Sequence, residues 1–218
     1  MKQEAERVID NLITKYGEEK TSLLLSYLDM VLERNRNINL TAVRDREEAV
    51  VKHIADSLVL TDLPEYAASD RIIDVGTGAG FPGALLAIVS PEKEFVLLDS
   101  TLKRLRVIDE FSEALGLSNL RTLHARAEEI GRKPEYSGAF DLCVSRAVAS
   151  LDKLAGWCLP FVRSGGYFIS YKGENYASEI EGAGKVLRKQ KAVLASVEQY
   201  KDAPADIAGH VLLVFSKK

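Results

Sequence analysis

The sequence predicts an α/β protein in which a mostly parallel, doubly wound sheet, with helices on both faces, follows a helical N-terminal extension. From residue 71 onward, short apolar segments alternate with amphipathic ones, which is the pattern of successive βαβ units. No helical segment separates the last two apolar segments, so we expect them to pair antiparallel at one edge of the sheet. Before this region, the apolar residues recur at helical spacing.

We expect residues 1–66 to form the helical extension and residues 67–218 to form the sheet domain, with both parts in one compact unit. The helical spacing is clearest around Leu24, Leu28 and Val31, and again around Ile54. Residues 34–39 lie between these runs and are too rich in asparagine for a helix interior. We therefore expect a loop or a frayed helix end there.

Each element of the sheet domain follows from a local pattern. Helices are expected where amphipathic segments end at a stop signal, such as Gly116 or Pro160. The expected strands span residues 71–75, 95–98, 120–123, 140–144, 166–171, about 192–199 and 210–215, and the expected helices span residues 82–89, 101–115, 151–159 and 176–188.

The composition and charge of the chain limit the classes of protein to which it can belong. The chain has 218 residues, of which 46% are hydrophobic and 28% charged, so it can bury a core without disulfide bonds or metals. Its net charge of −3 argues against nucleic-acid binding through bulk charge, although a local basic face would still permit it. The charged N-terminus and the short apolar runs lead us to expect a soluble, cytoplasmic protein that does not span a membrane.

The two cysteines, Cys143 and Cys158, lie in apolar segments, and we expect both to be buried free thiols. No pair of cysteines or histidines has the spacing of a zinc site, so we expect no metal.

A glycine-rich loop at the end of the first strand is the main candidate for ligand binding. Ligands of open α/β sheets sit beyond the carboxyl ends of the strands, and glycines let a ligand approach the backbone closely. Residues 78–83 fit the Gly-x-Gly-x-x-Gly string of dinucleotide sites. However, Asp74 precedes the glycines Gly76, Gly78 and Gly80, and an acid there can orient the loop and the ammonium group of S-adenosylmethionine. The purely structural alternative is that Asp74 caps a turn.

A second acid, Asp99, closes the second strand, where it can accept hydrogen bonds from ribose hydroxyls. Asp99 alone would serve NAD equally well, or could cap the helix that follows. Together with Asp74 and the glycines, it favours the methyl donor. The predicted sheet is then the Rossmann-like fold of class I S-adenosylmethionine-dependent methyltransferases.

Two further segments follow strands. Ala127 and Glu128 come after the third strand and are candidates to contact the adenine, although they could equally form a solvated first helical turn. Arg146 ends the fourth strand and could pair with the methionine carboxylate, an RNA phosphate or a guanine edge. The alternative for Arg146 is a surface ion pair.

Several motifs of this sequence are similar to those of a known family. From about Leu23 to its C-terminus, the chain resembles the ribosomal RNA small subunit methyltransferase G family, also called glucose-inhibited division protein B. One position departs from the family, which usually has a tryptophan where this chain has Arg34, and we expect altered packing there. The matching motifs are Asn39-Leu40-Thr41-Ala42, His53-x-x-Asp56-Ser57-Leu58, Ile73 to Gly83, Leu97-Leu98-Asp99-Ser100, Lys103-Arg104, Ser145-Arg146-Ala147 and Lys172-Gly173.

The resemblance implies methylation of guanine N7 in the 530 loop of 16S ribosomal RNA, with the RNA or the small ribosomal subunit as partner. It implies a ribose site around Asp99, Ser100 and Thr101. It also implies that the cofactor is contacted by Gly76, Phe81, Ala127, Glu128 and Arg146. We expect a monomer.

The chemistry agrees with this implication, because guanine N7 carries a lone pair and no proton. Its methylation needs alignment of the reactants rather than a general base. The sequence lacks the Asn/Asp-Pro-Pro-Tyr segment used on exocyclic amines, and neither cysteine follows a proline, as a cytosine-C5 nucleophile typically would. Arg146 is thus expected to act by positioning and not as a base.

Basic residues near the cleft are candidates for RNA contacts. They are Arg34, Arg36, Arg44 and Lys172, together with His53. For His53, a satisfied structural histidine and a cleft role together with Asp56 both stay open.

Two other functions compete with this prediction. One is an NAD-dependent oxidoreductase, against which the acid before the glycines argues. The other is a non-catalytic ribosome-binding module that retains a methyltransferase fold.

Overall fold

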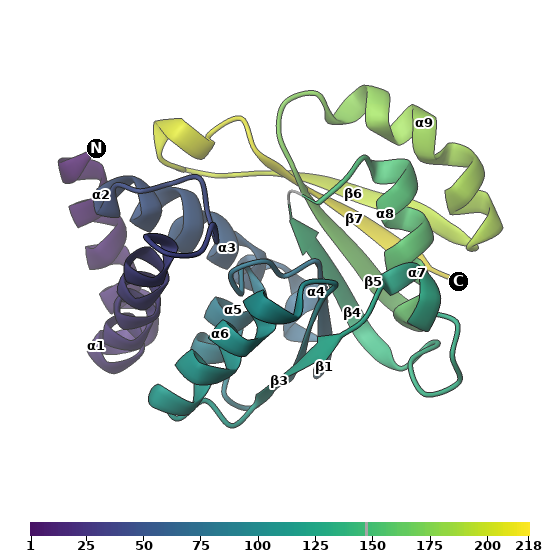
Figure 1. Ribbon diagram of the computed structural model, residues 1–218. Coiled ribbons are helices and arrows are strands. Elements are labelled where there is room, and N and C mark those ends of the chain that lie inside the picture. The colour runs from purple at the N-terminus through teal and green to yellow at the C-terminus, as the bar shows by residue number, and fades with distance from the viewer. Residues whose placement is uncertain (147) are drawn as a thin grey trace.

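A computed structural model, which describes residues 1–146 and 148–218, contains one seven-stranded sheet with the strand order β3-β2-β1-β4-β5-β7-β6 (Figure 1). This order confirms the predicted α/β fold. The strands are β1 (Arg71–Val75), β2 (Glu94–Asp99), β3 (Leu120–His124), β4 (Phe140–Arg146), β5 (Val162–Lys172), β6 (Ala192–Gln199) and β7 (Val211–Lys217).

The first five strands pair in parallel, and β7 runs antiparallel to both β5 and β6. The predicted antiparallel pair is therefore confirmed, with β6 at the edge and β7 between it and β5. The register aligns Val75 of β1 with Leu98 of β2, and Asp99 with His124 of β3. The carboxyl ends of these strands thus share one rim of the sheet.

Helices cover both faces of the sheet (Figure 1). Those of the sheet domain are α5 (Gly83–Val89), α6 (Leu102–Ala114), α7 (Ala127–Ile130), α8 (Leu151–Cys158) and α9 (Tyr176–Lys189), with short 3-10 turns η3 (Leu159–Phe161) and η4 (Ala205–Ile207). Those of the extension are α1 (Lys2–Asn35), α2 (Arg46–Ala49), a π-helix η1 (Val50–Ala55), α3 (Asp56–Leu58), a 3-10 turn η2 (Val59–Asp62) and α4 (Pro64–Ala67).

The period of two along each strand separates the core into two layers. On β1, Ile72 packs with the cluster that contains the buried residues of α1, η1, α5 and α6, whereas its neighbour Ile73 packs with α8. Both cysteines are buried free thiols in this second layer, as expected. The apolar residues of the extension have no separate core, because they join the sheet's first layer.

The predicted loop or frayed helix end at residues 34–39 is confirmed, although the loop itself begins only after Asn35. Arg34 and Asn35 are the last residues of α1, and the chain becomes irregular only after them. The reason is that Asn35 is buried and satisfied: its Oδ1 accepts from the amides of Leu40 (2.7 Å) and Thr41 (3.1 Å), and its Nδ2 donates to the Thr41 carbonyl (2.9 Å). The asparagine thus ends the helix by binding the returning chain. Helix α1 is also interrupted at Gly17, where φ is +84°.

Tyr27 of α1 connects the extension to the glycine-rich loop. Its buried hydroxyl donates to the Ala79 carbonyl at 2.9 Å, and its ring makes edge contacts with Phe81 and Phe111. Gly80 is required beside it, because φ is +92° and a Cβ there would collide with the Tyr27 hydroxyl.

Among the described residues, no helix has the length and hydrophobicity needed to cross a membrane.

We predict that Tyr27→Phe lowers the free energy of unfolding by about 1–2 kcal/mol, because the Ala79 carbonyl loses its buried donor. Denaturant titration followed by circular dichroism measures this change. Tyr16→Phe is the matched control, since the Tyr16 hydroxyl is only partly buried against Thr61, and its effect should be smaller. Equal stability of Tyr27→Phe and the unmodified chain would contradict the prediction.

Candidate active site

A cavity of about 450 Å³ opens at the carboxyl ends of the central strands. It brings together nine of the residues predicted for the site: His53, Gly76, Gly78, Phe81, Asp99, Ser100, Ala127, Glu128 and Arg146. Leu40, Thr41, Arg104, Arg126, Val148 and Trp157 also line it and were not predicted. Asp74, Gly80 and Thr101 are not in its lining.

The glycine-rich loop forms the cavity wall at the end of β1. The amides of Gly76 and Thr77 donate to the Leu98 carbonyl at 2.8 and 3.1 Å, which holds the loop against β2. Gly76 has φ of +76°, and a Cβ on it would lie 2.5 Å from the Val148 side chain. The close approach of Val148 therefore requires glycine at this position.

Asp74 supports the loop from behind. Its Oδ2 accepts from the Thr77 hydroxyl (2.7 Å) and the Gly83 amide (2.9 Å), so it links both ends of the turn. The side chain is buried, and this burial raises the pKa of Asp74 to about 6. The geometry fits the predicted orientation of the loop and equally the turn-capping alternative, and it places Asp74 outside the cavity lining.

Asp99 faces the cavity with a fixed carboxylate. One oxygen accepts from the Thr101 amide (2.8 Å) and the other from the Gly78 amide (3.0 Å), while Arg104 lies 3.8 Å away. Each carboxylate oxygen can accept two hydrogen bonds, so lone pairs stay available towards the cavity. Such a group can bind hydroxyls without moving.

Past β3, the cavity is bounded by the start of α7 and by α8. Ala127 is buried at the first turn of α7, whereas Glu128 is exposed and lies 3.9 Å from Arg126. Trp157 of α8 also lines this end of the cavity. The residues predicted to contact the adenine, Ala127 and Glu128, thus lie at this end of the cavity.

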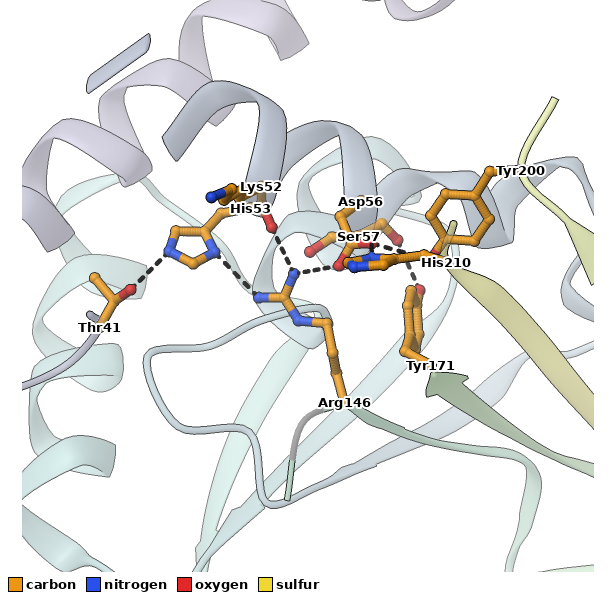
Figure 2. Close-up of polar contacts among 9 residues, drawn as sticks. All are labelled: Thr41, Lys52, His53, Asp56, Ser57, Arg146, Tyr171, Tyr200 and His210. Atoms are coloured by element: carbon orange, nitrogen blue, oxygen red, sulfur yellow. Dashed lines mark hydrogen bonds and ion pairs between the residues drawn. The ribbon is translucent and has the colours of Figure 1, made fainter. Parts of the chain in front are cut away.

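Arg146 lies at the end of β4 and reaches into the extension (Figure 2). Its Nη1 donates to Asp56 Oδ2 (2.7 Å) and to the Lys52 carbonyl (3.0 Å) of η1. The guanidinium also lies 5.6 Å from the centre of the Phe81 ring. The side chain is only 13% exposed, so the alternative of a surface ion pair for Arg146 is wrong.

His53 has partners for both ring nitrogens, as expected of a structural histidine, and it also lines the cavity. Its Nε2 lies 2.7 Å from the Thr41 hydroxyl, and its Nδ1 lies 3.4 Å from Arg146 Nη2. The ring stacks on Phe81 with centroids 4.7 Å apart. Burial and the neighbouring Arg146 lower the pKa of His53 to about 4, so the imidazole is neutral at physiological pH.

Asp56 is the centre of this network (Figure 2). Its Oδ1 accepts from the Tyr200 hydroxyl (3.0 Å) and from His210 Nδ1 (2.9 Å). Burial alone would raise the pKa of Asp56, but His210 and Arg146 reverse this and hold it below its usual value. Sequence reasoning missed Tyr200 and His210, because no local pattern relates the segment before β7 to residue 56.

Of the residues predicted for RNA contact, His53 lines the cavity, whereas Arg34, Arg36, Arg44 and Lys172 are not in its lining. Arg34 pairs with Glu110 (2.7 Å) and lies over the Phe111 ring, and Lys172 pairs with Glu179 (2.6 Å). Arg44 is exposed in the segment between α1 and α2. The Lys172 side chain is only 9% exposed, so its ion pair leaves little surface for a partner.

No group of three or more His, Cys, Asp or Glu side chains within residues 1–146 and 148–218 has an arrangement that could hold a metal ion.

We predict that His53 remains neutral down to about pH 4, whereas His210 titrates above its ordinary pKa because it donates to Asp56. Since the folded-state pKa of His53 lies below the unfolded value, its contribution to stability is lost as pH falls from about 6.5 towards 4. Proton–carbon NMR of the imidazoles, assigned with single His→Asn variants, measures both. A His53 midpoint near 6.5 would refute the neutral arrangement.

Sequence comparisons relate the chain to one protein family. Residues 20–207 match the family model described as rRNA small subunit methyltransferase G. The ribosomal RNA small subunit methyltransferase G of Clostridium tetani is 38% identical over 199 residues, covering 91% of this chain and 83% of that protein. The protein of the same name from Moorella thermoacetica is 41% identical over 169 residues, covering 78% of this chain and 70% of that protein.

Solved structures share the fold at low sequence identity. The ribosomal protein L11 methylase from Lactobacillus delbrueckii subsp. bulgaricus has a TM-score of 0.54 and 15% identity, covering 75% of this chain and 77% of that one. TYW2 from M. jannaschii, solved in complex with AdoMet, has a TM-score of 0.55 and 17% identity, covering 79% and 81%. These likenesses confirm the Rossmann-like methyltransferase fold.

The family match spans residues 20–207, which is most of the chain and includes every residue that lines the cavity. The chain belongs to the ribosomal RNA small subunit methyltransferase G family.

Proposed function

We propose that this protein transfers a methyl group from S-adenosylmethionine to N7 of a guanosine in the 530 loop of 16S ribosomal RNA. The observation that carries the proposal is the cavity itself, which has a fixed carboxylate, Asp99, on one side and a buried arginine, Arg146, on the other. Family membership supports the same reaction.

The cavity residues fit the cofactor. The tight backbone at Gly76 and Gly78 lets a ligand approach β1, and Asp99 retains lone pairs for the ribose hydroxyls. We assign the adenine to the surface between Ala127 and Trp157. When bound, S-adenosylmethionine supplies a methyl group on a positively charged sulfonium. Asp74 would act on this site through the loop.

The residues on the opposite side are arranged to position a base and not to remove a proton. Both ring nitrogens of His53 have partners, and Asp56 is ionised but bound by three donors. A nucleophile without a proton, such as guanine N7, needs neither group as a base. Alignment and exclusion of water then supply the rate enhancement.

An RNA substrate must present one splayed nucleotide to this cavity. We propose that Arg104 and Arg126, which line the cavity and are partly or fully exposed, contact the RNA backbone, and that the exposed Arg44 between α1 and α2 does so as well. Arg34 and Lys172 are weaker candidates, since each is held in an ion pair. We retain a monomeric, cytoplasmic protein as part of the proposal.

We predict that Asp99→Ala raises the dissociation constant for S-adenosylmethionine by about tenfold or more, which corresponds to about 1.4 kcal/mol or more. The reason is the loss of both the ribose acceptor and the hydrogen bond that holds Gly78. Isothermal titration calorimetry measures the constant. Asp109→Ala is the control, because Asp109 is an exposed carboxylate on α6 away from the cavity. An unchanged constant for Asp99→Ala would reject the ribose role.

We predict that Arg146→Ala abolishes methyl transfer while the protein stays folded, since Asp56 keeps its bonds to Tyr200 and His210. Labelled methyl transfer to small subunits from a strain lacking this activity, with mapping of the modified base, measures the effect. Full activity would refute the positioning role. If the unmodified protein transfers nothing to N7 yet binds the cofactor, the chain is a non-catalytic ribosome-binding module.

A further inference from the structure

The network around Arg146 fixes which hydrogen-bonding groups the extension presents to the cavity. Asp56 and the Lys52 carbonyl hold the guanidinium in place, so its Nη2 faces His53 Nδ1 (Figure 2). A guanidinium can only donate, and a neutral imidazole has one donor and one acceptor nitrogen. Nδ1 of His53 is therefore the acceptor, and the ring proton lies on Nε2.

This tautomer determines the role of Thr41. His53 Nε2–H donates to the Thr41 hydroxyl oxygen at 2.7 Å, and the Val43 amide donates to the same oxygen at 3.1 Å. A hydroxyl oxygen has two lone pairs, and both are thus occupied. Thr41 keeps one unused group, its hydroxyl hydrogen, which can only donate.

Thr41 is held in place and lines the cavity. Asn35 holds the Thr41 backbone by its amide and its carbonyl, and Thr41 lines the cavity beside His53 and Phe81. No acceptor for the hydroxyl hydrogen exists among the described residues. Thr41 comes from the extension, whereas the groups assigned to the cofactor come from the loop after β1 and the end of β2. The donor therefore belongs to the side of the cavity where the methyl acceptor must enter.

The proposed reaction defines what can accept from it. The exposed edge of guanine presents two acceptors, N7 and O6, and adenine has an amino group in place of O6. N7 must keep its lone pair free to take the methyl group, which leaves O6. We propose, on the basis of the function proposed above, that the Thr41 hydroxyl donates to O6 of the target guanine and selects guanine over adenine. Thr41 cannot accept from an adenine amino group, because both of its lone pairs are occupied.

The test removes the Thr41 hydroxyl and the O6 atom of guanine, first separately and then together. Small subunits are reconstituted with 16S RNA that carries either guanosine or 2-aminopurine riboside, which lacks O6 but keeps N7, at the target position. Methyl transfer is measured in single turnover at saturating S-adenosylmethionine for the unmodified protein and for Thr41→Val. We expect the unmodified protein to be about tenfold slower on 2-aminopurine, and Thr41→Val to treat the two substrates within about twofold of each other.

Two variants keep the test interpretable. Thr41→Ser retains a hydroxyl and should restore the preference for guanosine even if Thr41→Val lowers stability. Thr61→Val is the matched control, because Thr61 is a partly buried threonine outside the cavity lining, and its preference should equal that of the unmodified protein. Calorimetry should give the same S-adenosylmethionine affinity for Thr41→Val as for the unmodified protein.

Three results would overturn the inference. The first is an unmodified protein that does not distinguish the two substrates. The second is a Thr41→Val variant that keeps the full preference, which would make Thr41 merely structural. The third is weaker cofactor binding by Thr41→Val with an unchanged preference, which would place the contact on the cofactor. Absence of N7 transfer to guanosine by the unmodified protein would instead refute the proposed function.

Discussion

The buried ion pair between Asp56 and Arg146 joins the N-terminal extension to the carboxyl end of β4, and the arrangement of the active site depends on it. Removing two charges from water costs several kcal/mol per ion, and the attraction between them offsets this only if their other hydrogen-bonding groups are satisfied. Here Asp56 takes two further donors, from Tyr200 and His210, and Arg146 also donates to the Lys52 carbonyl. Because three distant parts of the chain meet at this pair, the extension is a component of the site.

The same network controls charge beside the reacting groups. Methyl transfer to N7 moves a positive charge from the sulfonium to the base, so a further uncompensated cation there would oppose the reaction. Arg146 is compensated by Asp56, and His53 is neutral. Protonation of His53 would place a charge in a buried site and beside Arg146, and both effects lower its pKa to about 4. The neutral histidine and the paired arginine therefore both keep uncompensated positive charge away from the reacting groups.

The sequence predicted the sheet and the cofactor side of the site because their signals are local. Short apolar segments between amphipathic ones defined the strands, and Asp74, the glycines and Asp99 lie at strand ends, where ligands of such sheets bind. The other side depends on long-range contacts that no local pattern carries. Asp56 and His210 are bonded across the fold, and α1 ends at Asn35 because residues 40 and 41 come back and bind its side chain. These polar residues would be expected in loops or at the surface from their local sequence. The hydrogen bonds that stabilise them in or near the core are visible only in the structure.

The two sides also differ in how they hold their ligands. On the cofactor side, Asp74 and Asp99 bind the backbone of the glycine loop, so the sheet itself sets the geometry. On the acceptor side, each group is fixed by the next: Asp56 holds Arg146, Arg146 sets the tautomer of His53, and His53 occupies a lone pair of Thr41. A change in any of these side chains therefore alters the hydrogen bonding of Thr41. The buried carboxylate of Asp56 thus determines, through three side chains, that the cavity presents a donor and not an acceptor to the incoming base.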